Sequence, residues 1–278
     1  MKYVSCKKIM VSIVSLMLLM IIGFPTKSDA IVLDWSSYTS LTWTQSGSTY
    51  STSIDFDPSN AGNDITISIS GDTGEFLTGY PYYSPGVNSI ITGGEGNNEE
   101  SLLLAFNWSS RSDSVTVTLN FHYADGIENL EFSLFDIDRL DEGNNSGFRD
   151  YISNIQASND GGANVIPTLT QEDDDYVTIA NKGKSSQTAR GDEGSADNSD
   201  NANVDFDFGT NVVDQVSFQY GNHSSAPSNP GQQGIGLYDI SFNKAKPKVP
   251  EVGTNLAAFC LCACVVLGRY IRRYRTAG

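Results

Sequence analysis

Apolar and polar residues alternate with a period of two in many short stretches of this chain. Such alternation is typical of strands with one buried and one wet face, and Gly, Asn, Asp, Ser and Pro separate the stretches. Between the two ends, no long stretch has helical periodicity. The pattern predicts an all-β fold, an antiparallel β-sandwich or jelly roll, with strands at Ser51–Phe56, Asp64–Ile69, Ser114–Phe121, Leu130–Phe135, Tyr151–Ala157, Tyr176–Ile179, Val204–Phe208, Val212–Tyr220 and Gly236–Phe242.

The first thirty residues have the order of a secretory signal peptide. Lysines precede an apolar run over residues 9–24, and the small residues Ser28 and Ala30 come just before Ile31. Signal peptidase recognises a basic start, an apolar segment and small residues at positions −3 and −1. We therefore expect an N-terminal signal helix that is removed, so that the mature chain begins near Ile31. An uncleaved membrane anchor is the alternative.

The last part of the chain, residues 244–278, has three components. Pro250-Glu251-Val252 is followed by an apolar stretch over Leu256–Leu267 and then by an arginine-rich end. These twelve apolar residues are fewer than the roughly 20 that a transmembrane helix needs, although residues 252–271 together come close to that length. Arginines after the stretch would stay in the cytoplasm and leave residues 31–243 outside. A segment of this kind can be a sorting signal, and the alternative is a plain membrane anchor at the tail.

This tail resembles the PEP-CTERM sorting signal of Gram-negative bacteria, in which a Pro-Glu-Pro motif, a short apolar helix and an arginine-rich end are recognised by an exosortase. Pro250 and Glu251 match the first two motif positions, and Val252 stands in place of the second proline. The resemblance implies a transient anchor in the inner membrane through the C-terminal helix, and an exosortase-like enzyme as partner. It further implies delivery to the cell surface or to an exopolysaccharide matrix.

The charge is concentrated between these two ends. The whole chain has 278 residues, 17 Lys+Arg and 33 Asp+Glu, and the ends carry eleven of the basic residues but only two of the acidic ones. Residues 31–243 therefore hold six basic and 31 acidic residues, a net charge of −25. Such a surface repels nucleic acid and attracts divalent cations. We expect one extracellular β-sandwich domain over residues 31–243, without cysteine, whose longest loop is Asn181–Asn203.

Acidic residues at strand ends form the sharpest candidate motif. An apolar strand ends in Asp136 and Asp138, an Arg-Asp pair places Asp150, and the segment Gly231–Phe242 contains Asp239. The pattern resembles a domain repeated in large bacterial surface and adhesion proteins, which implies a noncatalytic extracellular β-sandwich. Calcium takes six to eight oxygen ligands, so we expect calcium as a cofactor with these four aspartates as ligands. Alternatively, the aspartates pair with arginines and cap turns.

A tyrosine cluster is the candidate ligand site. Tyr80, Tyr82 and Tyr83 lie among Gly and Pro in a predicted loop, where flat rings could stack on the apolar faces of sugars. Packing of these rings in a core or a turn is the alternative.

Motifs of enzymes are scarce, since the two histidines lie outside any zinc motif and no nucleophile elbow, P-loop or dinucleotide fingerprint occurs. We therefore expect no enzymatic activity, and an exported, adhesion-like surface or matrix protein. A carbohydrate-binding module for extracellular polysaccharide is the first alternative. The second is a secreted glycoside hydrolase, which would need a carboxylate pair in a cleft.

Overall fold

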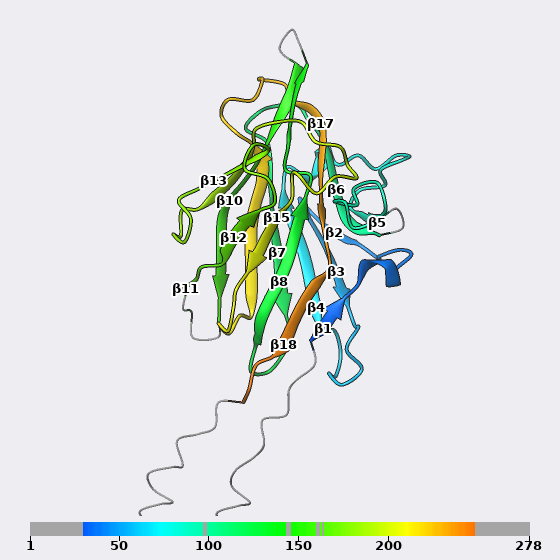
Figure 1. Cartoon of the computed structure of the whole chain (residues 1–278). Coiled ribbons are helices and arrows are strands. Elements are labelled where there is room, and N and C mark those ends of the chain that lie inside the picture. The colour runs from blue at the N-terminus through cyan, green and yellow to red at the C-terminus, as the bar shows by residue number, and fades with distance from the viewer. Residues whose placement is uncertain (1–29, 97–98, 143–145, 160–161, 163, 248–278) are drawn as a thin grey trace, which may run out of the picture.

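A computed structural model describes residues 30–247, apart from 97–98, 143–145, 160–161 and 163 (Figure 1). Strands make up 49% of the described residues and helix 3%, and the strands form two antiparallel sheets. The predicted all-β sandwich architecture is therefore confirmed. The predicted signal helix, the motif residues Pro250 and Glu251 and the C-terminal apolar helix lie outside the described residues. Within those residues no helix has the length and apolar character to cross a membrane.

The first sheet has the strand order β1-β18-β8-β17-β6-β5, with β15 also pairing with β8 and β12 pairing with β15. The strands are β1 (Ile31–Leu33), β5 (Gly86–Asn88), β6 (Ser101–Trp108), β8 (Ile127–Phe135), β12 (Thr168–Gln171), β15 (Val204–Asp207), β17 (Gly231–Leu237) and β18 (Ile240–Lys244).

The second sheet has the order β13-β14-β10-β16-β7-β4-β3-β2, with β9 and β11 also paired to β10. The strands are β2 (Thr44–Ser46), β3 (Thr49–Ile54), β4 (Ile65–Gly71), β7 (Ser114–Phe121), β9 (Arg139–Glu142), β10 (Ser146–Ser158), β11 (Asn164–Val165), β13 (Val177–Ala180), β14 (Thr188–Gly191) and β16 (Gln215–Asn222). Short 3₁₀ turns cover Trp35–Ser37 and Thr73–Glu75.

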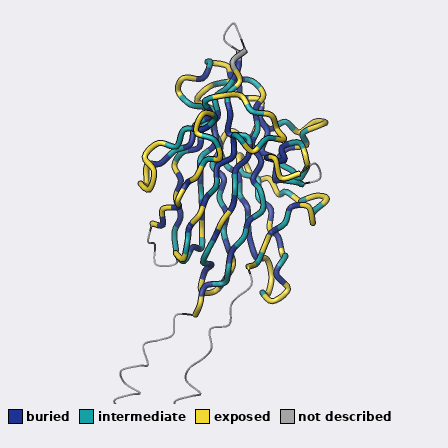
Figure 2. Tube along the Cα trace, viewed as in Figure 1, coloured by how far each residue is buried: buried dark blue, intermediate teal, exposed yellow. Residues whose placement is uncertain are grey.

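The core lies between the two sheets and follows directly from the alternation. In β7 the residues Val115, Val117, Leu119 and Phe121 are buried, whereas the Ser, Thr and Asn residues between them are partly exposed. Buried and exposed positions alternate in the same way along neighbouring strands, and fully exposed residues gather in the loops (Figure 2). Burial of one face of each sheet therefore holds the sandwich together.

The outer face of the second sheet carries hydroxyl and amide side chains. Paired positions run across adjacent strands, as in the row that joins Ser51, Ser68, Thr118 and Ser217. Some of these side chains bond across strands, such as Ser53 Oγ with Thr66 Oγ1 at 2.9 Å. The polar half of the sequence alternation thus forms the wet face of this sheet.

Strand β6 is buried on both faces. Leu102, Leu104 and Phe106 belong to the main core. Leu103 and Ala105 point the other way, into a smaller apolar cluster with Ile91 and Phe135. Segment 77–92 therefore covers the outside of the first sheet at this point, and the candidate site lies beneath it.

Both described chain ends lie at one end of the sandwich. Strand β1 pairs antiparallel with β18, so that Ile31 lies opposite Phe242, and β8 begins beside Lys244 (Figure 1). From Ile127 the strand β8 runs away from that end. At about 3.3 Å per residue, Asp136 lies about 30 Å further along. The residues after β8 therefore lie far from the described chain ends, Ala30 and Pro247.

Candidate functional site

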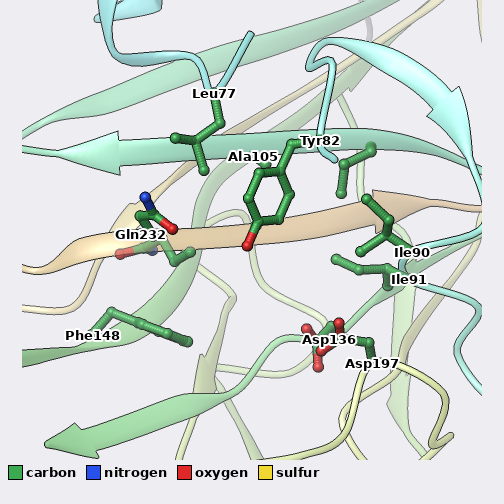
Figure 3. A pocket seen from close by; sticks show the side chains of 12 residues that line it. Leu77, Tyr82, Ile90, Ile91, Ala105, Asp136, Phe148, Asp197 and Gln232 are labelled. Atoms are coloured by element: carbon green, nitrogen blue, oxygen red, sulfur yellow. The ribbon is translucent and has the colours of Figure 1, made fainter. Parts of the chain in front are cut away.

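A pocket of about 150 Å³ lies between segment 77–91 and strands β6 and β17. The ring of Tyr82 projects into this pocket, and the carboxylates of Asp136 and Asp197 lie beside each other across from it (Figure 3). The wall is therefore apolar on one side and rich in oxygen on the other. Its remaining lining residues are Leu77, Ile90, Ile91, Leu103, Ala105, Phe148, Gln232, Gln233 and Gly234.

Hydrogen bonds hold the tyrosine loop on β6. Ser84 Oγ accepts from the Ala105 amide at 2.8 Å and donates to the Leu103 carbonyl at 3.3 Å. Asn88 Nδ2 donates to the Tyr82 carbonyl at 2.9 Å. The side-chain bonds of Ser84 and Asn88 thus fix the backbone at Tyr82 and just after the tyrosines, so that the pocket is preformed.

The three predicted tyrosines divide into two groups. Tyr82 is partly buried and packs on the small apolar cluster. Tyr80 and Tyr83 are 84% and 61% exposed, and their ring centroids lie 6.2 Å apart in an edge-on arrangement. The structure therefore brings only Tyr82 into the pocket and leaves Tyr80 and Tyr83 as an exposed aromatic pair on the same loop.

Asp136 and Asp138 follow β8 directly. Asp136 has a φ of +65°, a left-handed conformation that Asp and Asn adopt more readily than most residues. Burial, together with the charges of Asp138 and Asp197, holds the pKa of Asp136 well above its usual value. Burial also raises the pKa of Asp138 to about 7, although the Ser195 amide, which donates to Asp138 Oδ2 at 2.9 Å, favours the charged form.

Asp150 lies inside the sandwich rather than on the pocket surface. It is fully buried, and its Oδ1 accepts from the Tyr220 hydroxyl at 2.8 Å and from Gln233 Nε2 at 2.6 Å. Burial and the nearby charge of Asp138 raise its pKa well above the usual value. Asp150 therefore joins the two sheets through a polar network in the core.

Asp239 belongs to a different site. It lines a shallow pocket of about 470 Å³ with Ser133 and Asp205, and its Oδ1 accepts from the Trp35 amide at 3.0 Å. The four aspartates predicted as one ligand set are thus not brought together, because Asp150 faces the core and Asp239 lies on the outside of β8. Among the described residues, no group of three or more His, Cys, Asp or Glu side chains is arranged to hold a metal ion.

Replacing Asp239 with asparagine is expected to stabilise the protein at neutral pH. Burial and nearby carboxylates raise the pKa of Asp239 from 3.8 to about 6. The folded state then binds more protons than the unfolded state between about pH 4 and pH 6, so that the free energy of unfolding falls as the pH rises through this window. The substituted asparagine avoids this loss, and its side-chain oxygen can still accept from the Trp35 amide.

For a half-exposed group we expect a gain of about 1 kcal/mol at pH 7 and little difference at pH 4. Urea denaturation of both proteins at the two pH values measures this effect. If the free energy of unfolding changes equally between pH 4 and pH 7 in the wild type and in Asp239→Asn, this prediction is wrong.

The site also contains residues that the sequence reading did not single out. Gln232 and Gln233 lie at the start of β17, and Asp197 lies in the predicted loop Asn181–Asn203. Neither type of residue carries a local signal of its own. The Gly-Gln-Gln-Gly order at Gly231–Gly234 marks a place where β17 passes close to β6, since a Cβ on Gly234 would lie 3.1 Å from Ala105.

Comparisons with known proteins give little similarity. No family model matches the chain, and no curated protein matches it. Among solved structures, a carbohydrate-binding module studied for its specific recognition of mannan aligns with 79% of this chain and with all of its own chain, at 15% identity and a TM-score of 0.32. A similarity this low says nothing about the function of the present chain.

Proposed function

We propose that this protein is an exported, noncatalytic β-sandwich of the cell surface or exopolysaccharide matrix, and that it binds polysaccharide at the Tyr82 pocket. The observation that carries the proposal is the presence of an aromatic ring and of several hydrogen-bonding side chains in one preformed pocket. A pyranose ring has an apolar face that can stack on tyrosine. Its hydroxyls can bond to the oxygens of Asp136 and Asp197 and to Gln232.

The size of the pocket indicates the kind of glycan. About 150 Å³ is smaller than the pockets of about 300–1,000 Å³ that enclose drug-sized ligands. The pocket therefore suits a single sugar unit, and the exposed pair Tyr80 and Tyr83 offers further stacking surface for neighbouring units on the same loop. Because the outside of the chain is acidic, a neutral glycan fits it better than an anionic one.

The export signals and the pocket suit display on a surface. We infer that signal peptidase removes residues 1–30 and that an exosortase-like enzyme acts at Pro250 and Glu251 of the C-terminal segment. The described chain ends lie at one end of the sandwich, about 30 Å along β8 from Asp136. An anchor at that end would leave the pocket facing outward.

The proposal predicts that the tyrosines are needed for retention on polysaccharide. Tyr80→Ala with Tyr83→Ala removes exposed rings at little cost to folding, and Tyr82→Leu keeps the apolar packing but removes the ring. We expect each change to weaken binding about tenfold, which corresponds to about 1.4 kcal/mol. Affinity electrophoresis of the full chain in detergent, in gels that contain exopolysaccharide of the producing cells, measures the retention.

Tyr151→Ala is the matched control, because Tyr151 lies on the second sheet and contacts His223 instead of the pocket. It should be retained like the wild type. Equal retention of the wild type and both pocket variants would refute glycan binding at this site.

A further inference from the structure

Buried oxygen atoms without hydrogen-bond donors gather beneath the Tyr82 pocket. Among the described residues, Asp136 Oδ1, Asp138 Oδ1, Gln233 Oε1 and Ser195 Oγ are enclosed and have no hydrogen-bond partner. Gln233 is only 6% exposed and Asp138 also 6%. A buried acceptor without a partner destabilises the folded state, and more so when it is charged. Several such atoms close together need an explanation.

Hydrogen bonds through Asp150 connect Asp138, Ser195 and Gln233, and the charge of Asp138 acts on Asp136 beside them. The Ser195 amide donates to Asp138 Oδ2 at 2.9 Å, and the Asp138 amide donates to Asp150 Oδ2 at 3.3 Å. Gln233 directs its Nε2 to Asp150 Oδ1 at 2.6 Å. The side-chain amide of Gln233 therefore directs its nitrogen toward Asp150 in the core. Its oxygen is left without a donor in the wall that Gln233 shares with Asp136 and Asp197.

Among the described residues, the ion pairs of the nearby arginines go to carboxylates outside this cluster. Arg149 and Arg190 both pair with Asp192, and Arg139 lies 3.7 Å from Glu193. No ion pair of the described residues involves Asp136, Asp138 or Asp150. Carboxylates enclosed without a cation are strongly destabilising unless they are protonated or bind an ion.

We propose that a single calcium ion binds here, between the carboxylates of Asp136 and Asp138, with Gln233 Oε1 and Ser195 Oγ as neutral ligands. Backbone carbonyls or water would complete the site, and Asp197, which lies beside Asp136 at the open side, would be a nearby negative charge rather than a ligand. Calcium accepts this mixture of carboxylate, amide and hydroxyl oxygens in a flexible arrangement, whereas magnesium demands a near-ideal octahedron. Two carboxylates rather than three agree with the lack of a larger acidic group among the described residues.

The ion would also explain how an acidic loop is held. Segment 193–203 is held at the end of β8 by the bond from Ile137 N to the Ala202 carbonyl at 2.9 Å. The bond from Thr92 N to the Asp197 carbonyl, also 2.9 Å, ties it to segment 77–92. Calcium would join Asp136 and Asp138 on one side to Ser195 on the other. Calcium binding is a property separate from glycan binding, and it can be measured without any glycan.

Calorimetric titration of the chelator-treated full chain in detergent with calcium chloride tests the site. We expect saturable binding of one ion and a rise in melting temperature that calcium produces and an equal concentration of magnesium does not. If the chain binds calcium but is not retained on polysaccharide, only the proposed function is refuted. Glycan binding that persists in chelator, with no calcium uptake, would refute only this inference.

Asp136→Asn is the decisive variant, since asparagine tolerates the left-handed backbone at this position. Without calcium, the variant should melt at or above the temperature of the wild type, because one buried charge is gone. With calcium, it should lose at least tenfold in affinity and most of the thermal gain. Asp207→Asn, a matched change at an exposed aspartate of β15, should respond like the wild type. Equal destabilisation of Asp136→Asn with and without calcium, or an unchanged calcium response, would overturn the inference.

Discussion

Replacing Gly191 with alanine is expected to lower the free energy of unfolding by about 3 kcal/mol or more. A Cβ at this position would lie 2.0 Å from the carbonyl oxygen of Asp138 and 2.6 Å from its Cα. These are backbone atoms, so that no side-chain rotation can relieve the clash. Strand β14 and residue 138 would have to move apart. That movement weakens the bond from Arg149 Nε to the Gly191 carbonyl, now 2.7 Å, and displaces Asp138.

Gly74→Ala is the matched control, because a Cβ there meets no atom within 4 Å. Urea denaturation followed by far-ultraviolet circular dichroism should place Gly74→Ala within about 0.5 kcal/mol of the wild type. Gly191→Ala should also lose calcium uptake, since Asp138 is shifted. If Gly191→Ala unfolds like Gly74→Ala, then the close approach of β14 to residue 138 is wrong.

The sequence allowed prediction of strands that have one wet face. Strand β7 begins and ends where the alternation of Ser114–Phe121 places it, and β4 and β8 overlap their predicted ranges. In these strands a polar side chain at every second position reports directly on the exposed face of a sheet.

Strand β6 lacks that signal, because both of its faces are buried. The run Leu102–Phe106 is continuously apolar, since alternate residues serve the main core and the small cluster under segment 77–92. Alternation cannot indicate such a strand, and only the cover supplied by segment 77–92 shows why both faces are apolar.

The loop predicted over Asn181–Asn203 was wrong in part, since it contains β14. This strand, Thr188–Gly191, is short and has a single buried apolar side chain, Ala189, so that it has no local apolar signal. Its stability comes from pairing with β13, the strand just before it, and with β10, which is more distant in the sequence. Pairing between distant strands is not visible in a local pattern.

The candidate site could be predicted in pieces but not as a whole. Tyr82 and Asp136 were each singled out, for sugar stacking and for calcium, and they lie 54 positions apart. The structure places both in one pocket because segment 77–91 is tied to β6 and β17 lies between β6 and β8. Gln233 was not singled out, since a glutamine in a strand becomes a candidate ligand only when its neighbours are known.

Replacing Trp108 with alanine is expected to cost about 4 kcal/mol of folding free energy. Trp108 is fully buried at the end of β6, and its ring stacks on Phe106 at a centroid distance of 4.2 Å. It also meets Tyr220 of the opposite sheet at 6.3 Å, beside the network of Asp150. Alanine would leave a large cavity between the sheets at the point where they support the candidate site.

Trp108→Phe separates packing from hydrogen bonding, because Trp108 Nε1 has no hydrogen-bond partner among the described residues. Phenylalanine removes this unpartnered group and keeps the stacking on Phe106, so that the loss should be only about 1 kcal/mol. Urea denaturation followed by circular dichroism compares the variants, with Tyr83→Ala as a control at an exposed ring. A loss below about 1 kcal/mol for Trp108→Ala would mean that this ring does not bridge the two sheets. The polar network of Asp150, Tyr220 and Gln233 would then have to hold this end of the sandwich by itself.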